Sequence, residues 1–134
     1  VHNFGYSYSS SRLRETGRYG FYANRYDYLR IAKTMLEDWH NDTCAGKYLK
    51  MLYQQRIKKD DNVSDPDDVG LYTASYGGQF HFDVFGLKKQ RIIGLSGFAG
   101  QQILIDIDAK RIIVVNSLYR NYDWKKIVYD KIKN

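Results

Sequence analysis

The spacing of the apolar residues changes once along the chain, and this change limits the folds that the sequence can adopt. Between residues 24 and 57 the apolar positions recur at helical spacing, about every 3.6 residues. A charged stretch at 58–70 follows, and after it residues 79–85 alternate between polar and apolar, which is typical of a strand. Helices and strands therefore occupy separate blocks of the sequence, and we predict an α+β fold.

Two helices are expected before the charged stretch. The first begins after a capping Asn24 and runs to about His40, and the second runs from about Ala45 to Ile57. Residues 1–24 show no sustained period, so we interpret them as a loop with at most a short strand. The side chains expected to face inward are Tyr28, Ala32, Met35, Leu36 and Trp39 in the first helix and Tyr48, Leu49 and Leu52 in the second.

The second half of the chain indicates an antiparallel sheet. Its strands are expected at 79–85, 91–96, 102–107 and 111–116. The connection at 108–110 is short enough to make a hairpin of the last two strands. Phe80, Phe82 and Val84 are expected on one face of their strand, and the unbroken apolar run of the last strand predicts burial on both of its faces.

The last segment, 121–133, is predicted to be a helix that packs on one face of the sheet. Its apolar residues at helical spacing are Trp124, Ile127, Val128 and Ile132. The loop at 58–70 joins the two helices to the sheet without any other sign of a boundary, so residues 1–134 are interpreted as a single unit.

Composition and motifs argue against several functional classes. The formal charge is +6, but the basic residues are mostly scattered and no nucleic-acid-binding motif accompanies them, so we expect no nucleic-acid partner. No apolar run reaches the ~18 residues of a membrane span. The single cysteine, Cys44, is expected to be partly buried, and the three histidines lack a zinc-binding spacing, so we predict neither a metal nor a cofactor.

Two stretches of the sequence together carry a family resemblance. One is Gly20-Phe21-Tyr22 continuing through 27–36 to Gly46 and Leu49. The other is Tyr76 to Phe80, then Gly94-Leu95-Ser96-Gly97-Phe98-Ala99-Gly100-Gln101, then the apolar runs 103–107 and 112–116. The chain from about residue 20 onwards resembles the serine β-lactamase-related family, which includes class C β-lactamases, DD-peptidases and aminohexanoate-dimer hydrolases.

The resemblance implies an incomplete β-lactamase/transpeptidase-like fold and an acyl-enzyme mechanism on an ester, amide or β-lactam. Leu95-Ser96-Gly97 falls where the family has a Lys-Thr-Gly or His-x-Gly strand that lines the substrate, so it implies substrate-binding roles for these three residues. The backbone N–H of Phe98 would form half of the oxyanion hole. Leu95 in place of Lys or His favours an esterase- or amidase-like member.

The family's nucleophile is a Ser-x-x-Lys serine, and no serine of this chain has a lysine three residues later. We therefore interpret residues 1–134 as a C-terminal fragment that is inactive alone. Without the family's N-terminal strands the sheet would have an exposed edge, so we expect a missing N-terminal portion of the same protein, or a homo-oligomer, as partner. The resemblance implies a bacterial, periplasmic or extracytoplasmic protein.

One alternative from another class remains, and it rests on the aromatic content. The sequence holds 13 tyrosines, whose amphipathic rings are common on contact surfaces. The alternative is a non-catalytic protein- or glycan-binding module that uses the same fold. In that case the glycines of residues 94–100 would mark a turn between strands and no catalytic site.

Overall fold

The structure is a computed structural model that describes residues 5–7, 20–59, 73–87, 89–97, 101–116 and 124–133. Strands β3 to β8 form one antiparallel sheet in which each strand lies beside the next along the chain, and β1 and β2 form a separate antiparallel pair. The predicted α+β class is confirmed. The elements are β1 (Gly5–Ser7), β2 (Gly20–Tyr22), α1 (Arg25–Asn41), α2 (Cys44–Gln54), β3 (Ile57–Lys58), β4 (Thr73–Gly77), β5 (Phe80–Val84), β6 (Ile92–Ser96), β7 (Gln102–Asp106), β8 (Arg111–Val115) and α3 (Trp124–Ile132).

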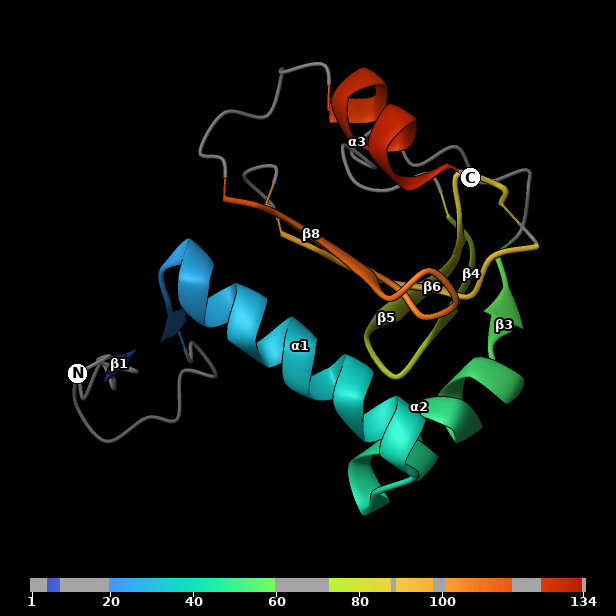
Figure 1. Ribbon diagram of the computed structural model, residues 1–134, viewed down its shortest axis with the longest axis horizontal. Coiled ribbons are helices and arrows are strands. Elements are labelled where there is room, and N and C mark those ends of the chain that lie inside the picture. The colour runs from blue at the N-terminus through green and yellow to red at the C-terminus, as the bar shows by residue number, and fades with distance from the viewer. Residues whose placement is uncertain are drawn as a thin grey trace, which may run out of the picture.

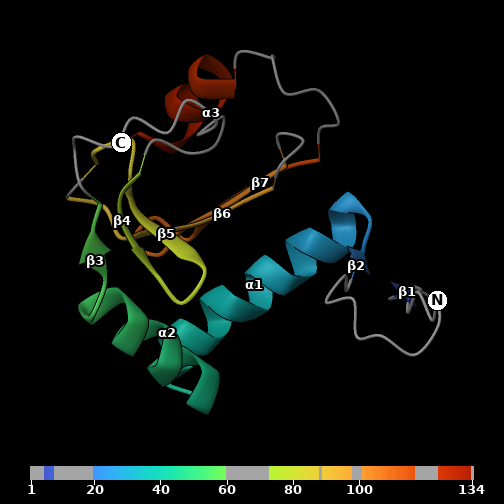
Figure 2. The same ribbon diagram turned by 180° about the vertical axis from the view of Figure 1, so that it is seen from behind.

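The sheet lies between two helical layers. In Figure 1 the helices α1 and α2 lie on one side of the strands and α3 lies on the other, and Figure 2 shows the same layers from behind. Each layer encloses its own apolar core. The buried members of the α1 core are Ala32, Leu36, Trp39, Leu49, Phe82, Ile93, Ile105 and Ile107, and those of the α3 core are Val84, Ile92, Leu104, Val128 and Ile132.

Helix α1 begins where its capping residue predicts. The Asn24 side chain accepts hydrogen bonds from the backbone N–H groups of Tyr26 and Asp27, at 2.9 and 3.1 Å. The Asp27 carboxylate in turn accepts from the Asn24 backbone N–H at 3.4 Å, which completes a capping box. The helix ends before Asp42, whose φ of 56° is left-handed. The predicted apolar face is confirmed at Ala32, Leu36 and Trp39, which are buried.

Helix α2 differs from the prediction in its length and in two side chains. It ends at Gln54, three residues early, and Cys44 at its first position is exposed, where partial burial was expected. Tyr48 was predicted to face inward and is 52% exposed, because α2 packs through a narrow stripe centred on Leu49. A Cβ at Gly46 would lie 1.9 Å from the backbone oxygen of Asp38, so this glycine permits the close contact between α1 and α2.

Strand β4 was missed by the sequence analysis, because Ala74, Ser75 and Gly77 give it a weak apolar pattern. It pairs with β5 through a two-residue turn, in which Gly78 and Gln79 both have positive φ, 56° and 69°. This combination of angles is the one that matches the twist of a hairpin.

The prediction that Phe80, Phe82 and Val84 share one face of β5 was wrong. Phe80 and Phe82 belong to the α1 core, whereas Val84 lies in the α3 core on the opposite face. The cause is Asp83, whose φ of 51° is left-handed and interrupts the alternation of a regular strand.

Strand β8 lies at one edge of the sheet. Ile112 packs against the α1 core and Ile113 and Val115 pack against the α3 core, so both faces of β8 are covered, as the sequence predicted. All five residues of the strand are nevertheless only half-buried. In the part of the chain that the structure describes, no strand pairs with the outer edge of β8.

Helix α3 packs on the sheet as predicted, through buried Val128 and Ile132. Ile127 was expected on the same face and is 59% exposed, because the buried stripe of this helix is narrow. The Trp124 side chain lies outside the described part of the structure. The C-terminal carbonyl groups of α3 are bound by the sheet: Arg111 donates to that of Lys131 at 2.5 Å, and Gln90 donates to that of Ile132 at 3.0 Å.

Candidate functional site

A cavity of about 230 Å³ opens at one end of β6, β7 and β8, beside the first turns of α1. Figure 1 shows these strand ends approaching the start of α1. Leu95, Ser96 and Gly97, for which the family resemblance implies substrate binding, all line this cavity. The described residues that line it are Tyr28, Leu95, Ser96, Gly97, Gln101, Gln102, Ile103, Val114 and Val115.

Gly97 occupies a tight connection between β6 and β7. Its backbone N–H donates to the backbone oxygen of Gln101 at 2.8 Å. A Cβ at Gly97 would lie 2.6 Å from Oε1 and 3.1 Å from Cβ of Gln101, so a larger residue requires the Gln101 side chain to move. The glycine therefore has a local packing reason at the end of β6, where it also lines the cavity.

Ser96 and Gln102 form a polar pair across β6 and β7. They face each other in the strand register, and Gln102 Nε2 donates to Ser96 Oγ at 3.2 Å. Gln102 is buried, whereas Ser96 is exposed. Because the Ser96 hydroxyl accepts from Gln102, its own hydrogen remains available to donate to a ligand oxygen.

The Gln102 side chain is not fully satisfied. Its Oε1 atom is buried and has no hydrogen-bond partner among the described residues. A buried amide oxygen without a partner costs roughly 1 to 3 kcal/mol. Gln102 was not predicted as a site residue, because it stands at the polar start of β7, directly after Gln101.

The nine described lining residues include no carboxylate, imidazole or amine that could activate a nucleophile. They are aliphatic, amide, hydroxyl, phenolic or glycine. The described residues at this site can therefore bind and orient an uncharged group, but they do not form a serine–base pair. The Phe98 backbone N–H, implied as an oxyanion-hole donor, lies outside the described residues.

Strand β6 has a neighbouring strand on each side in the sheet. Strand β7 pairs with all of Ile92 to Ser96, and β5 lies on the other side, where His81 pairs with Gly94. Leu95 and Ser96, for which the resemblance implies substrate binding, therefore belong to an interior strand of the described sheet.

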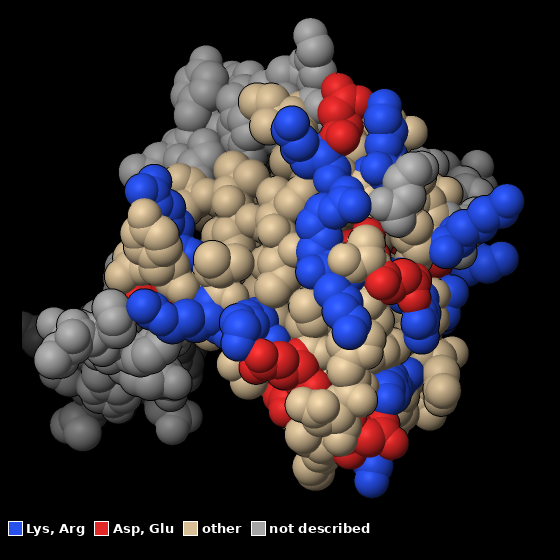
Figure 3. Space-filling view, viewed as in Figure 1, with Lys and Arg blue, Asp and Glu red and all other residues tan. Residues whose placement is uncertain are grey.

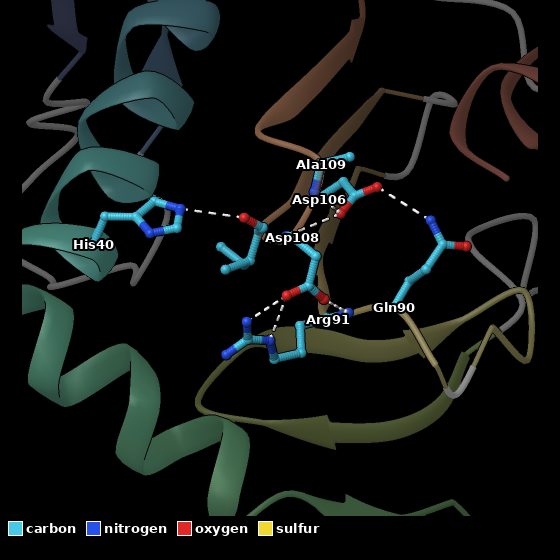
Figure 4. Close-up of polar contacts among 7 residues, drawn as sticks. His40, Gln90, Arg91, Asp106, Asp108 and Ala109 are labelled. Carbon is cyan, nitrogen blue, oxygen red and sulfur yellow. Dashed lines mark hydrogen bonds and ion pairs between the residues drawn. The ribbon is translucent and has the colours of Figure 1, made fainter. Parts of the chain in front are cut away.

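The opposite end of the same strands is closed by a polar turn, which Figure 4 shows in detail. The Asp106 carboxylate is fully buried and accepts hydrogen bonds from the backbone N–H groups of Asp108 and Ala109 and from Gln90 Nε2, at 3.0 to 3.1 Å. His40 Nε2 of α1 lies 3.2 Å from the backbone oxygen of Ile107. These bonds stabilise the β7–β8 turn and attach it to its neighbours.

Arg91 and Asp108 form the exposed part of this turn. Arg91 donates through Nε to Asp108 Oδ1 at 2.8 Å and through its backbone N–H to Oδ2 at 2.9 Å. The side-chain hydrogen bond from Arg91 holds the pKa of Asp108 below its ordinary value of 3.8.

A second polar group joins α2 to the β4–β5 hairpin. Arg56 Nε donates to Asp83 Oδ2 at 3.0 Å, and Ser75 Oγ donates to the same oxygen at 2.5 Å. The Arg56 guanidinium also lies 4.1 Å from the centre of the Tyr53 ring. Ser75 is only 1% exposed, so a substrate does not reach its hydroxyl, and the group has a structural role.

Three further observations concern metal binding, membrane spans and the distribution of charged side chains. Among the described residues, no group of three or more His, Cys, Asp or Glu side chains is placed to hold a metal ion. None of the helices in the described ranges has the length and apolar character needed to cross a membrane. Figure 3 shows Asp and Glu side chains among the Lys and Arg side chains of the face that it presents. The ion pairs are Arg30–Asp27, Lys33–Glu37, Lys50–Asp42, Arg56–Asp83, Arg91–Asp108 and Lys133–Asp130.

Comparisons of this chain with protein-family models, with curated proteins and with solved structures each found no significant match.

Proposed function

We propose that this chain is the C-terminal, substrate-facing part of a serine hydrolase that acts through an acyl-enzyme on an ester, an amide or a β-lactam. The observation that supports it best is the cavity of about 230 Å³ against Leu95, Ser96 and Gly97. These are the residues for which the sequence resemblance implies substrate contact, and all three line the cavity.

The proposal gives each residue of the site a physical task. The Ser96 hydroxyl, which accepts from Gln102, donates to a carbonyl oxygen of the substrate. Gly97 allows the substrate to approach the backbone closely, and the Phe98 N–H supplies one donor to the oxyanion. The nucleophile and its base belong to a Ser-x-x-Lys motif in a preceding portion of the protein, since this chain has none.

The outer edge of β8, which no described strand pairs with, supports the proposal of a further structural partner. All five residues of β8 are half-buried and the four after Arg111 are β-branched, and Figure 3 shows that the surface over β8, between α1 and α3, is largely uncharged. An exposed apolar edge strand is a ready template for pairing with another strand. We propose that a strand of the N-terminal portion pairs there, and that separate copies of this chain pair with each other when that portion is absent.

The first test is to read the gene upstream of Val1 and to treat the full-length protein with a fluorophosphonate or a penicillin probe. We expect a Ser-x-x-Lys motif and covalent labelling of its serine, which is lost when that serine is replaced by alanine. A gene that lacks the motif, or a full-length protein that neither probe labels, contradicts the proposal.

The second test is the solution state of residues 1–134, measured by analytical ultracentrifugation. We expect self-association, because the edge of β8 has no partner among the described strands. Ile113→Lys places a charge in the middle of this strand and is expected to reduce association. A compact monomer of high stability contradicts the partner proposal.

The alternative of a tyrosine-based binding module has weaker support. The exposed tyrosines among the described residues include Tyr26, Tyr48 and Tyr129, with 57%, 52% and 37% of their surfaces accessible. Tyr26 and Tyr48 lie on α1 and α2, on one side of the sheet, and Tyr129 lies on α3, on the other side, so these three do not form one contact surface (Figure 1).

A further inference from the structure

We propose that the cavity at the end of β6 binds an uncharged, mainly apolar group that carries one hydrogen-bond acceptor, and that it rejects carboxylates. This inference rests on the proposed function, because it names the class of substrate group that the site holds. It applies equally to the acyl part or the alcohol or amine part of a neutral ester or amide.

The preference for a neutral group follows from the lining. Leu95, Ile103, Val114 and Val115 supply aliphatic surface, and none of the nine lining residues carries a formal charge at neutral pH. A carboxylate that enters such a cavity loses its hydration and meets no cation among the described lining residues. An uncharged ester of the same shape loses far less hydration free energy when it enters the cavity.

The nearby N-terminus of α1 begins with the cation Arg25, which donates to the Tyr26 hydroxyl at 3.2 Å and is not among the described lining residues. Helix N-termini favour anions because their first N–H groups are unpaired. Here the Asn24 side chain already accepts from Tyr26 and Asp27, and the Asp27 carboxylate adds a negative charge in the first turn. Arg30 is the cation that pairs with Asp27, at 2.7 Å, so it is engaged as well.

Among the polar groups of the lining, Ser96 is expected to make the directed contact with the bound group. Its hydroxyl accepts from the buried Gln102 amide, and a hydroxyl that accepts in this way is a better donor to a further oxygen. A carbonyl or ether oxygen placed at the end of β6 therefore gains one directed hydrogen bond, which orients the apolar part towards Leu95 and Ile103.

The volume sets the size of the group. An engineered apolar cavity of about 150 Å³ holds a benzene molecule. The cavity here, at about 230 Å³, has space for a benzene-sized ring with a short substituent. A matched pair of probes of this size is methyl benzoate and benzoate, which differ by one methyl group and one charge.

The test is the binding of these two probes to residues 1–134, followed by amide chemical shifts in NMR titrations. We expect methyl benzoate to shift the amides of Ser96, Gln102 and Ile103, and to bind at least roughly tenfold more tightly than benzoate. Equal affinities, tighter binding of benzoate, no binding of either probe, or shifts located elsewhere in the chain would overturn the inference.

A charge exchange sharpens the test. Leu95→Lys places an ammonium group in the lining, and we expect it to abolish or reverse the preference for methyl benzoate. Leu95→Gln is the neutral variant of similar length, and Ile57→Lys adds the same charge at the 75% exposed Ile57 of β3, on the other edge of the sheet. Both are expected to keep the preference, and a Leu95→Lys variant that folds and also keeps it counts against the inference.

The outcomes for the cavity and for the parent activity are separable. Binding of methyl benzoate by this chain does not need the nucleophile, so it tests the cavity alone. A labelled full-length protein with no neutral-probe binding keeps the hydrolase proposal and removes this inference. If this chain binds methyl benzoate and the gene lacks an upstream Ser-x-x-Lys, the inference about the cavity is kept and the hydrolase proposal is removed.

Discussion

At one end of β6, β7 and β8 the chain closes with a hydrogen-bonded turn, and at the other end the same strands open onto a cavity. The turn end has a buried carboxylate, Asp106, with three hydrogen-bond donors. The cavity end has a buried amide, Gln102, whose Oε1 has no partner among the described residues. The difference teaches that the buried carboxylate is hydrogen-bonded at the end where the strands are held together. The buried amide beside the candidate site keeps an oxygen without a hydrogen-bond partner among the described residues.

The largest effect is expected at the turn end. Asp106→Ala leaves the N–H groups of Asp108 and Ala109 and the Gln90 amide without their acceptor, and we expect it to lower the free energy of unfolding by about 2 to 4 kcal/mol. Urea denaturation followed by circular dichroism measures this loss. Asp106→Asn retains one carbonyl acceptor for the turn and should lose less. An alanine variant as stable as the asparagine variant would show that the carboxylate does not hold the turn.

A smaller loss is expected at Gly97 in the cavity end. Gly97→Val introduces side-chain atoms where a Cβ alone would lie 2.6 Å from Gln101 Oε1, so we expect a loss of about 1 to 2 kcal/mol and weaker methyl benzoate binding. Gly97→Ala is the graded control and should give an intermediate result in both measurements. A valine variant with unchanged stability and unchanged affinity contradicts the described packing of this connection.

The exposed ion pair at the turn has a smaller and pH-dependent effect. Asp108→Asn is expected to lower the free energy of unfolding by less than about 1 kcal/mol at neutral pH. The pKa of Asp108 is depressed in the folded protein, so its contribution is present above its ordinary value of 3.8 and is lost as the pH falls through the folded value. Wild type and variant should therefore converge in acid, and a difference that grows on acidification would contradict the pairing with Arg91.

The smallest effect is expected at Gln102. Gln102→Leu removes the unpaired Oε1 together with the bond to Ser96 while it retains most of the volume, so we expect stability to change by no more than about 0.5 kcal/mol. Gln102→Ala removes the same groups but leaves a void, and it should cost clearly more. If leucine proves as harmful as alanine, the amide is satisfied in solution, and the contrast between the two ends of the strands is weaker than described.

Local sequence signals predicted much of the fold. Asn24 with Asp27 three residues later marked the start of α1, and the helical spacing of Ala32, Leu36 and Trp39 marked its buried face. The apolar runs of β7 and β8 and the short connection between them were sufficient to predict their hairpin. Of the candidate site, Leu95, Ser96 and Gly97 were named from the sequence, and the role in catalysis implied for them stays a prediction.

The remaining errors and omissions have one physical origin, which is that side-chain periodicity describes a regular element and says nothing of its neighbours. By itself the sequence determined the elements and the class of the fold, because capping and apolar spacing act within a few residues. Only the tertiary structure decided that Asp83 turns left-handed to meet Arg56 and Ser75, and that Val84 consequently enters the other core. It also decided that Gln102 lies opposite Ser96, because strand register is set by packing across the whole sheet.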